Sequence, residues 1–135
     1  MIEWKNQPDN INDYTAFVYI IKNLHTGKKY LGYKMYWKTI KRKPLKGYKR
    51  ARIDKVQTDW KTYWGSCKEL LNDMKSIGKH NFERTILLNC KSKMEARYEE
   101  TRLQFEHQVL LSKGWYNNMI NVRLGGNGIP DYMKK

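Results

Sequence analysis

Residues 15–34 read TAFVYIIKNLHTGKKYLGYK and contain the clearest strand signals of the chain. Residues 15–22 are rich in β-branched and aromatic side chains, a composition that favours a strand. Residues 23–27 (NLHTG) have the composition of a turn, and residues 28–34 form a second short strand. The stretch therefore predicts a β-hairpin.

The register of this hairpin decides which side chains meet. If Lys22 pairs with Gly27 across a four-residue loop, Tyr19 lies directly opposite Tyr30. Directly opposite residues of an antiparallel pair share one face of the sheet. We therefore expect these two tyrosines to be neighbours on one face.

The next segment, residues 38–55, is dominated by positive charge and carries a single acid, Asp54. Its low periodicity predicts a loop or an irregular excursion. A solvated charged loop is the usual fate of such a run, but this density of like charge favours an anionic partner, and we expect phosphate contacts. The candidates for nucleic-acid binding are Lys41, Arg42, Lys43, Lys46, Lys49, Arg50 and Arg52. Aromatic residues that flank the segment either stack on bases or fill the core: Tyr33, Tyr36, Trp37, Tyr48, Trp60, Tyr63 and Trp64.

A helix followed by a third strand comes next. Ser66 with Glu69 three residues on forms a capping-box pattern, which predicts a helix start at Ser66. Gly78 is the expected stop of this helix. Residues 82–89 (FERTILLN) predict the third strand.

The remaining chain completes an α+β pattern. Ser92 with Glu95 repeats the capping box and predicts a longer helix to about Ser112. Residues 1–13 are polar and read as a leader with little regular structure. We therefore expect residues 14–135 to form one α+β domain, a small antiparallel sheet with helices packed against it, with the basic insertion at about 38–55.

Composition narrows the class of protein. The chain has 135 residues and a formal net charge of +14, so one basic domain with an anionic partner is expected, nucleic acid before an anionic membrane. Two cysteines, Cys67 and Cys90, are too few for a disulfide scaffold or a zinc site. No apolar run is long enough to span a membrane and no secretory signal is visible. A reducing cytoplasm is the expected location.

One carboxylate on the second helix lies in an unusual position. Ala96, Glu100, Leu103, His107 and Leu110 follow one side of the helical wheel, so Glu100 sits within a mainly apolar stripe. A carboxylate in such a stripe is costly unless it is paired or binds a metal. A salt bridge to one of the many Lys and Arg residues is the alternative, and His107 reads as a satisfied core histidine.

Several motifs together resemble the GIY-YIG nuclease family, and in particular its small phage-encoded members. Residues 17–19 (FVY) and 30–32 (YLG) are similar to the two motif strands of that family. Residues 64–66 (WGS) and 78–82 (GKHNF) resemble the middle of phage-type members. Glu100 and the following threonine resemble the metal-binding glutamate segment.

This resemblance covers roughly residues 15–125 and implies both a fold and an activity. The implied fold is a three-stranded antiparallel sheet with flanking helices, and the implied reaction is metal-dependent cleavage of DNA phosphodiester bonds. Carried over by position, Tyr19 would activate or orient the attacking water, and Tyr30 would help to order water and phosphate. Glu100 would bind Mg²⁺ (or Mn²⁺), which polarises the phosphate and stabilises the leaving oxygen.

The chain also departs from the family pattern. Many members carry an arginine soon after the second motif, and here Lys34 is the first candidate for that role and Arg42 the second. Lys34 is placed to lower the pKa of a motif tyrosine and to neutralise charge on the phosphate. The late asparagine of the family is either Asn117 or Asn121.

The expected function is therefore a metal-dependent DNA endonuclease, phage-encoded and of a homing or DNA-degrading type. A catalytically inactive DNA- or RNA-binding module is the alternative, because it would explain the charge and the aromatic residues equally well. The chain leaves little room for a separate DNA-reading domain. Any sequence preference would therefore come from the basic segment or from a homo-oligomer on DNA.

Overall fold

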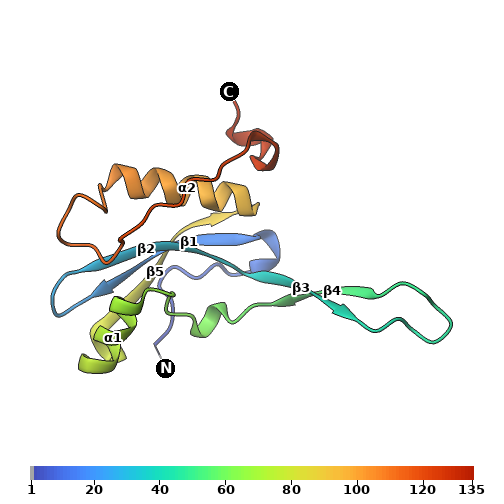
Figure 1. Cartoon of the computed structure of the whole chain (residues 1–135), viewed down its shortest axis with the longest axis horizontal. Helices are drawn as coiled ribbons and strands as arrows, with labels where there is room; N and C mark the ends of the chain where they lie inside the picture. The colour runs from blue at the N-terminus through green and yellow to red at the C-terminus, as the bar shows by residue number, and fades with distance from the viewer. Residues whose placement is uncertain (1) are drawn as a thin grey trace.

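The computed structural model describes residues 2–135, which form a three-stranded sheet, a separate two-stranded sheet and two α-helices (Figure 1). This arrangement confirms the predicted α+β class. No helix within these residues has the length and apolar character needed to cross a bilayer. The strands are β1 (Ala16–Asn23), β2 (Lys29–Met35), β3 (Trp37–Arg42), β4 (Arg52–Gln57) and β5 (Phe82–Cys90), and the helices are α1 (Lys68–Ile77) and α2 (Lys93–Glu106).

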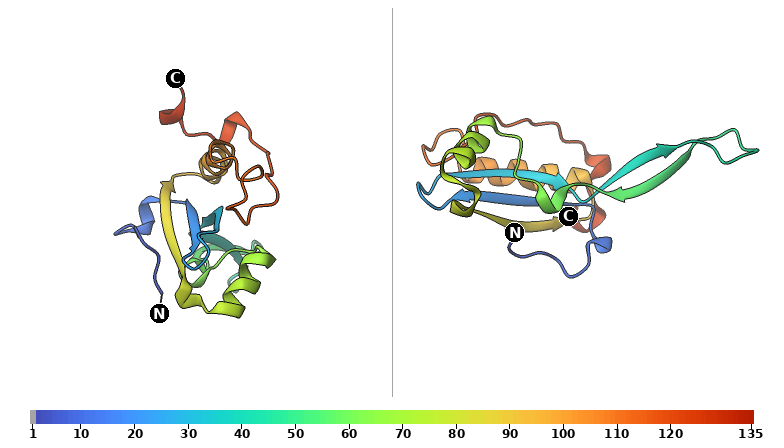
Figure 2. Two further views of the ribbon diagram at one scale, coloured as in Figure 1. Left: turned by 90° about the vertical axis from the view of Figure 1, so that its left-hand side faces the viewer. Right: turned by 90° about the horizontal axis from the view of Figure 1, so that it is seen from below.

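The main sheet has the order β2-β1-β5, with β1 in the middle and antiparallel to both neighbours. Helix α2 covers one face of the sheet, as the end-on view in Figure 2 shows. Ala16, Val18 and Leu31 lie under α2 and pack with Ala96 of that helix. The opposite face is covered by α1, the N-terminal segment and the segment between β4 and α1.

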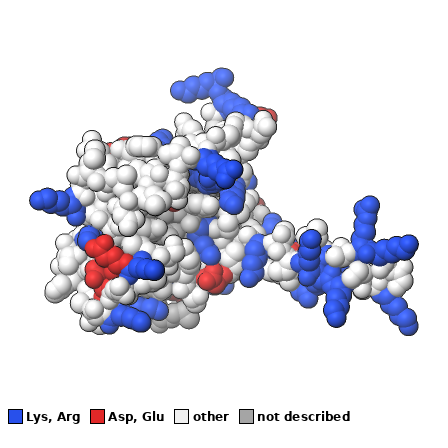
Figure 3. Space-filling view, in the orientation of Figure 1, with Lys and Arg blue, Asp and Glu red and all other residues white. Residues whose placement is uncertain are grey.

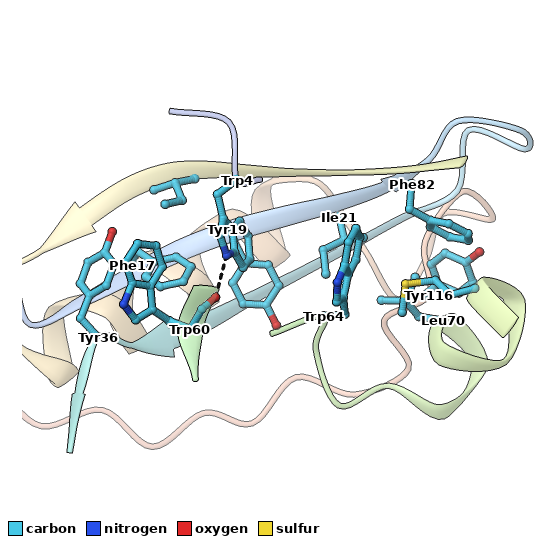
Figure 4. Close-up of a cluster of buried hydrophobic side chains, with 12 residues drawn as sticks. Trp4, Phe17, Tyr19, Ile21, Tyr36, Trp60, Trp64, Leu70, Phe82 and Tyr116 are labelled. Carbon is cyan, nitrogen blue, oxygen red and sulfur yellow. Dashed lines mark hydrogen bonds between the residues drawn. The ribbon is translucent and has the colours of Figure 1, made fainter. Parts of the chain in front are cut away.

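That opposite face holds an aromatic core (Figure 4). Phe17 of β1 lies at its centre, with ring centroids 5.1 Å from Trp4, 4.6 Å from Tyr36 and 6.1 Å from Trp60. The indole nitrogen of Trp4 donates a 2.7 Å hydrogen bond to the carbonyl of Trp60. The first residues, expected to be a leader with little regular structure, are thus anchored in the core through Trp4.

The hairpin of β1 and β2 has a different register from the one that the sequence predicted. Lys22 pairs with Lys29, and Tyr19 lies opposite Gly32, not opposite Tyr30. The cause is Asn23, which continues β1 for one more residue and whose side chain accepts hydrogen bonds from the next turn. The shift is by two positions, so Tyr19 and Tyr30 still share one face, as expected.

The basic segment is not the irregular loop that was expected. It forms an antiparallel ribbon of β3 and β4 that projects from the body of the protein, and we call residues 37–57 the basic arm (Figures 1 and 2). The β-branched residues Thr39, Ile40, Ile53 and Val56 lie in its two strands and favour extended backbone. In the sequence, the many Lys and Arg residues around these four positions hid the strand pattern.

The two helix starts differ in how well they were predicted. Ser92 caps α2 as expected, because its hydroxyl accepts a 3.0 Å hydrogen bond from the Glu95 backbone N–H. Helix α1 instead starts at Lys68 after Cys67, without a side-chain cap, so the capping box predicted at Ser66 is wrong. Gly78, with φ of +91°, ends α1 as predicted.

The end of α2 comes earlier than expected. The helix stops at Glu106, not near Ser112, because Gln108 adopts a left-handed conformation with φ of +52°. His107, expected to be a core residue, is exposed at this end, with its ring centroid 5.5 Å from that of Trp115.

Candidate functional site

The two motif tyrosines meet above a glycine of β2. Tyr19 of β1 lies opposite Gly32, and Tyr30 projects from the same face of β2 two residues earlier. A Cβ atom on Gly32 would lie 2.7 Å from the Tyr19 hydroxyl and 3.1 Å from Tyr30 Cε1. Only a residue without a side chain therefore lets the Tyr19 hydroxyl extend across β2.

A second glycine approaches the same hydroxyl from the segment before α1. Gly65 has φ of +84°, and a Cβ there would contact the Tyr19 hydroxyl at 3.5 Å. Tyr63, two residues earlier, packs edge-on against Tyr19 at a centroid distance of 6.0 Å. Tyr19 is consequently only 1% exposed, and its hydroxyl lies beneath the surface.

A cavity of about 500 Å³ opens beside Tyr30. It lies between β2, the start of α1, helix α2 and the C-terminal segment, and its walls include Tyr30, Glu100, Asn117 and Asn121. The structure thus brings together one motif tyrosine, the predicted metal ligand and both candidate asparagines. Tyr19 does not line the cavity but lies behind Tyr30, with a centroid distance of 6.3 Å between the rings.

Glu100 is held in this cavity at an electrostatic cost. Burial raises its pKa to about 7, and a backbone hydrogen bond from Tyr33 and the charge of Arg97 only partly oppose the rise. No ion pair to Glu100 is found among residues 2–135, so the salt-bridge alternative for this carboxylate has no partner in the structure. A half-buried carboxylate without a cation is the arrangement that a bound metal ion would stabilise.

The side-chain oxygen of Gln104, close to Glu100 on α2, has no hydrogen-bond partner. Gln104, one turn along α2, lines the same cavity and is 4% exposed. Its amide nitrogen donates to the carbonyl of Leu31 at 3.3 Å, while its carbonyl oxygen has no hydrogen-bond partner. The part of the chain that the structure describes contains no cluster of three or more His, Cys, Asp or Glu residues that could hold a metal. The carboxylates that line the cavity are Glu100 and Glu69, of which Glu69 is paired with Lys28, and amide side chains lie beside them at Gln104, Asn118 and Asn121.

The pKa values of the two motif tyrosines are raised, whereas Lys34 was expected to lower one of them. Burial, followed by the neighbouring phenols of Tyr30 and Tyr63, raises the pKa of Tyr19 well above its ordinary value. Burial also raises the pKa of Tyr30 to about 12, against a hydrogen bond from Ser66 that lowers it. Both phenols are therefore protonated at neutral pH.

Lys34 does not act on these phenols in this structure. Its Nζ pairs with Asp59 at 2.8 Å and lies 4.2 Å from the centroid of the Tyr63 ring. The same pair holds the pKa of Asp59 below its usual range. The expectation that Lys34 lowers the pKa of a motif tyrosine is thus wrong, because Asp59 takes its charge and burial governs the phenols.

The sequence analysis did not identify Arg84, whose guanidinium binds the backbone of the segment that covers Tyr19. Arg84 is the third residue of β5 and is 1% exposed, with its guanidinium 4.5 Å from the ring centroid of Trp4 and 4.2 Å from that of Trp64. It donates to the carbonyls of Lys61 and Tyr63, at 3.2 and 2.7 Å, and to a carbonyl of the N-terminal segment. This clamp holds the segment that places Tyr63 and the following residues over Tyr19. An arginine inside a predicted strand carries no signal for such a role.

The two candidate asparagines have different surroundings. The Asn117 side chain is buried, and both of its polar atoms are hydrogen-bonded to the backbone of Leu31. Its oxygen accepts from the Leu31 N–H at 3.0 Å, and its nitrogen donates to the Leu31 carbonyl at 2.8 Å. It therefore pins β2 next to Tyr30. Asn121 is exposed at the mouth of the cavity.

The predicted nucleic-acid contacts lie together on the basic arm, away from the cavity (Figure 3). Their side chains are exposed to solvent along the ribbon and at its tip. Arg42 is part of this group and pairs with Asp54 across the ribbon, so it does not line the cavity. Of the two candidates for the family arginine, Lys34 is the one that contacts Tyr63, the residue that packs against Tyr19.

Comparison with known proteins adds one finding. A family model described as "Putative endonuclease segE, GIY-YIG domain" matches residues 2–120. No curated protein and no solved structure matches the chain. The matched range contains both motif tyrosines, the basic arm, Glu100 and Asn117.

Proposed function

The chain belongs to the GIY-YIG nuclease family, and from this premise we propose that it is an endonuclease that hydrolyses DNA phosphodiester bonds with a divalent metal ion bound through Glu100. The observation that carries this proposal is the meeting of Tyr30 and Glu100 in one cavity, with Tyr19 directly behind Tyr30. These residues come from three separate elements of the chain.

The donors around Glu100 suit Mg²⁺ or Mn²⁺. Mg²⁺ keeps several water ligands and is commonly bound by one or two carboxylates together with substrate phosphates. Glu100 supplies one carboxylate, and the side chains of Glu69 and Asn121 in the same cavity are further acceptors for metal-bound waters. When bound, the ion would polarise the phosphate and stabilise the leaving oxygen.

The two tyrosines would then act mainly by orientation. Because both phenols are protonated, the Tyr30 hydroxyl in the cavity wall can donate a hydrogen bond to a phosphate oxygen or to the attacking water. Tyr19, packed between the rings of Tyr30 and Tyr63, would hold the neighbouring Tyr30 in position or orient the attacking water. Lys34, which lies over the Tyr63 ring, would help to neutralise charge that builds on the phosphate if it exchanged its pair with Asp59 for the phosphate.

Removing a single hydroxyl tests the role of Tyr19. We expect Tyr19→Phe to lower the cleavage rate by ~10²-fold or more, because a positioned acid–base or orienting group contributes on that order. Tyr36→Phe is the matched control: it removes another core hydroxyl, bonded to Asn89 and outside the cavity. Single-turnover cleavage of supercoiled plasmid measures both, and equal rates for the two variants would exclude Tyr19 from the reaction.

Gly32 offers a steric test of the same geometry. The methyl group of Gly32→Ala would push against the Tyr19 hydroxyl, which packed rings prevent from moving freely. Since a misplacement of about 1 Å can cost ~10²-fold in rate, we expect a loss of that order. Gly126→Ala, where a methyl group meets no atom within 4 Å, should cleave at the wild-type rate. A fully active Gly32→Ala would show that the close approach has no part in catalysis.

The proposed function is tested most directly with supercoiled plasmid in Mg²⁺, in Mn²⁺ and in EDTA. Metal-dependent nicking or linearisation would support the endonuclease. Tight, salt-sensitive binding without cleavage in either metal would favour the alternative, a catalytically inactive DNA- or RNA-binding module. A phage origin, a homing role and a homo-oligomer on DNA stay predictions.

We also propose that the basic arm provides most of the affinity for DNA. Its exposed Lys and Arg side chains can neutralise phosphates and release counterions, which gives strong and salt-dependent binding. Such contacts position the protein on the backbone and carry no sequence information. How the arm meets the nucleic acid therefore needs a separate argument.

A further inference from the structure

The basic arm has the dimensions of an element that fits a groove. Each strand, β3 and β4, contains six paired residues, which corresponds to about 20 Å of ribbon before the tip. The ribbon projects beyond the body of the protein on its own (Figure 2). The major groove of B-form DNA, about 12 Å wide, admits a two-stranded β-ribbon, whereas the minor groove, about 6 Å wide, does not without deformation.

Positive charge lies on both faces of this ribbon. The strand register places Lys41 and Lys55 on one face and Lys38, Arg42 and Arg52 on the other. A ribbon lying flat on a nucleic acid would need charge on one face only. Charge on both faces fits an element with a phosphate backbone on each side.

Two positively charged residues of the arm lie directly opposite each other on the neighbouring strands. Arg42 and Arg52 are cross-strand partners, and like charges in this position destabilise a sheet. Asp54, the one acid in the ribbon, compensates Arg42, and Arg52 turns its Nε to a backbone carbonyl at 3.3 Å. An external anion would relieve the remaining repulsion.

The tip adds apolar groups between its charges. Leu45 and Tyr48 are 51% and 72% exposed, and they flank a turn closed by a 2.9 Å hydrogen bond between their backbones. Gly47, with φ of +88°, makes this turn possible. Lys46, Lys49 and Arg50 surround it and are exposed. Apolar side chains of this kind contact the thymine methyl group in the major groove.

The base of the arm is fixed to the catalytic sheet. The Trp37 indole donates to the carbonyl of Tyr14 at 3.0 Å, and its ring stacks under the Lys55 ammonium. Tyr36, buried between β2 and β3, exchanges backbone hydrogen bonds with Thr15 and Thr58. The base of the arm is therefore attached to the sheet that carries Tyr30.

From these observations we propose that the basic arm lies in the major groove of duplex DNA, with Leu45 and Tyr48 at the base edges, and so sets where the cavity meets the backbone. This inference rests on the proposed function, since it assumes that DNA is the substrate. The deep and narrow major groove of A-form RNA would exclude the arm, so the proposal selects duplex DNA.

Photocrosslinking on a short duplex tests the groove directly. One duplex carries 4-thiothymine, which puts the reactive sulfur in the major groove in place of O4, and a second carries 2-thiothymine, with sulfur in the minor groove in place of O2. We expect crosslinks from the 4-thiothymine duplex to peptides within residues 43–50, and none to these peptides from the other duplex. Crosslinks to the arm from the minor groove, or none to the arm from either duplex, would overturn the proposal.

This experiment is done with the full chain in EDTA, so it does not depend on cleavage. A protein that crosslinks as expected but never cuts DNA would refute the endonuclease and leave the arm placement intact. A protein that cuts DNA but fails to crosslink through the arm would support the endonuclease and refute the placement of the arm.

Charge removal at the tip provides a second measurement. For the triple variant K46Q/K49Q/R50Q we expect the slope of log K against log salt on duplex DNA to fall in magnitude by roughly 2–3, at about 0.9 per lost phosphate contact. The control K22Q/K75Q/K113Q removes the same charge from exposed positions outside the arm and the cavity. Equal slopes for the two triple variants would overturn the proposal.

Discussion

Glu100→Gln is expected to abolish cleavage of supercoiled DNA in Mg²⁺, with a loss of at least ~10³-fold. The substitution keeps the shape of the side chain and removes the one carboxylate that lines the cavity at its α2 wall. A metal ion contributes several kcal/mol to stabilising a phosphoryl transition state, and each 1.4 kcal/mol corresponds to about a factor of ten in rate. Glu100→Ala should behave in the same way.

Binding of DNA should survive this substitution, because no residue of the arm lines the cavity that holds Glu100. Electrophoretic mobility shift on a duplex, beside the cleavage assay, separates the two effects. Glu106→Gln is the matched control on the same helix, since Glu106 is exposed, pairs with Arg102 and does not line the cavity. Cleavage by Glu100→Gln at the wild-type rate would show that the metal assignment is wrong.

The same variant should also change the pH dependence of folding stability in EDTA. Burial raises the pKa of Glu100 from about 4.5 to about 7, so between these values the folded state holds a proton that the unfolded state has released. The stability of the wild type therefore falls as the pH rises through this window. Glu100→Gln should match the wild type below about pH 4 and exceed it by on the order of 2–3 kcal/mol above about pH 8. Urea denaturation across this range measures the difference, which must be pH-dependent if burial of the carboxylate is its cause.

Arg84→Ala is expected to destabilise the fold by about 3–5 kcal/mol. The substitution removes a fully buried side chain between two indole rings and leaves three backbone carbonyls without their donor. Each buried acceptor left unpaired costs about 1–3 kcal/mol, and the cavity between Trp4 and Trp64 adds to that cost. Burial lowers the pKa of Arg84 only to about 10, so the side chain is charged at neutral pH and hydrogen-bonds as a cation.

Arg84→Lys separates the charge from the geometry of the guanidinium. Lysine retains the charge but lacks the planar group that stacks on both rings and reaches carbonyls on two segments, so we expect an intermediate loss. Arg102→Ala is the control, because its side chain is exposed and its pairs with Glu99 and Glu106 contribute about 0.5 kcal/mol or less each. Urea denaturation with a constant slope between variants gives the comparison. Equal stability of the two alanine variants would show that Arg84 is not a clamp.

The sequence predicted those elements whose causes are local. The β-branched run of 15–22, the capping box of Ser92 with Glu95, and the glycine stop at Gly78 act within a few residues. The cap and the stop occur as predicted, and the strand is shifted by one residue to Ala16–Asn23. The α+β class follows from their order. The predicted pairing of Tyr19 with Tyr30 was wrong, but their predicted position on one face of the sheet is confirmed. A shift of the register by two residues keeps side chains on the same face.

The basic arm shows where local reasoning failed. Its strands were hidden because lysine and arginine occupy both faces of the ribbon, so the alternation of apolar and polar residues that marks a half-buried strand is missing. The side chains that fix the base of the arm, Trp37 and Tyr36, contact residues more than twenty positions away. No local pattern reports such contacts.

The strands of the main sheet, the presence of two helices, the strong positive charge and the residues that resemble the family motifs could all be read from the sequence. Only the tertiary structure decided that Tyr30 and Glu100 share a cavity, that Gly32 makes room for the Tyr19 hydroxyl, and that Arg84 supports the segment above it. The physical reason is distance along the chain: conformational preferences act over a few residues, whereas these contacts join elements that pack together only when the core is buried.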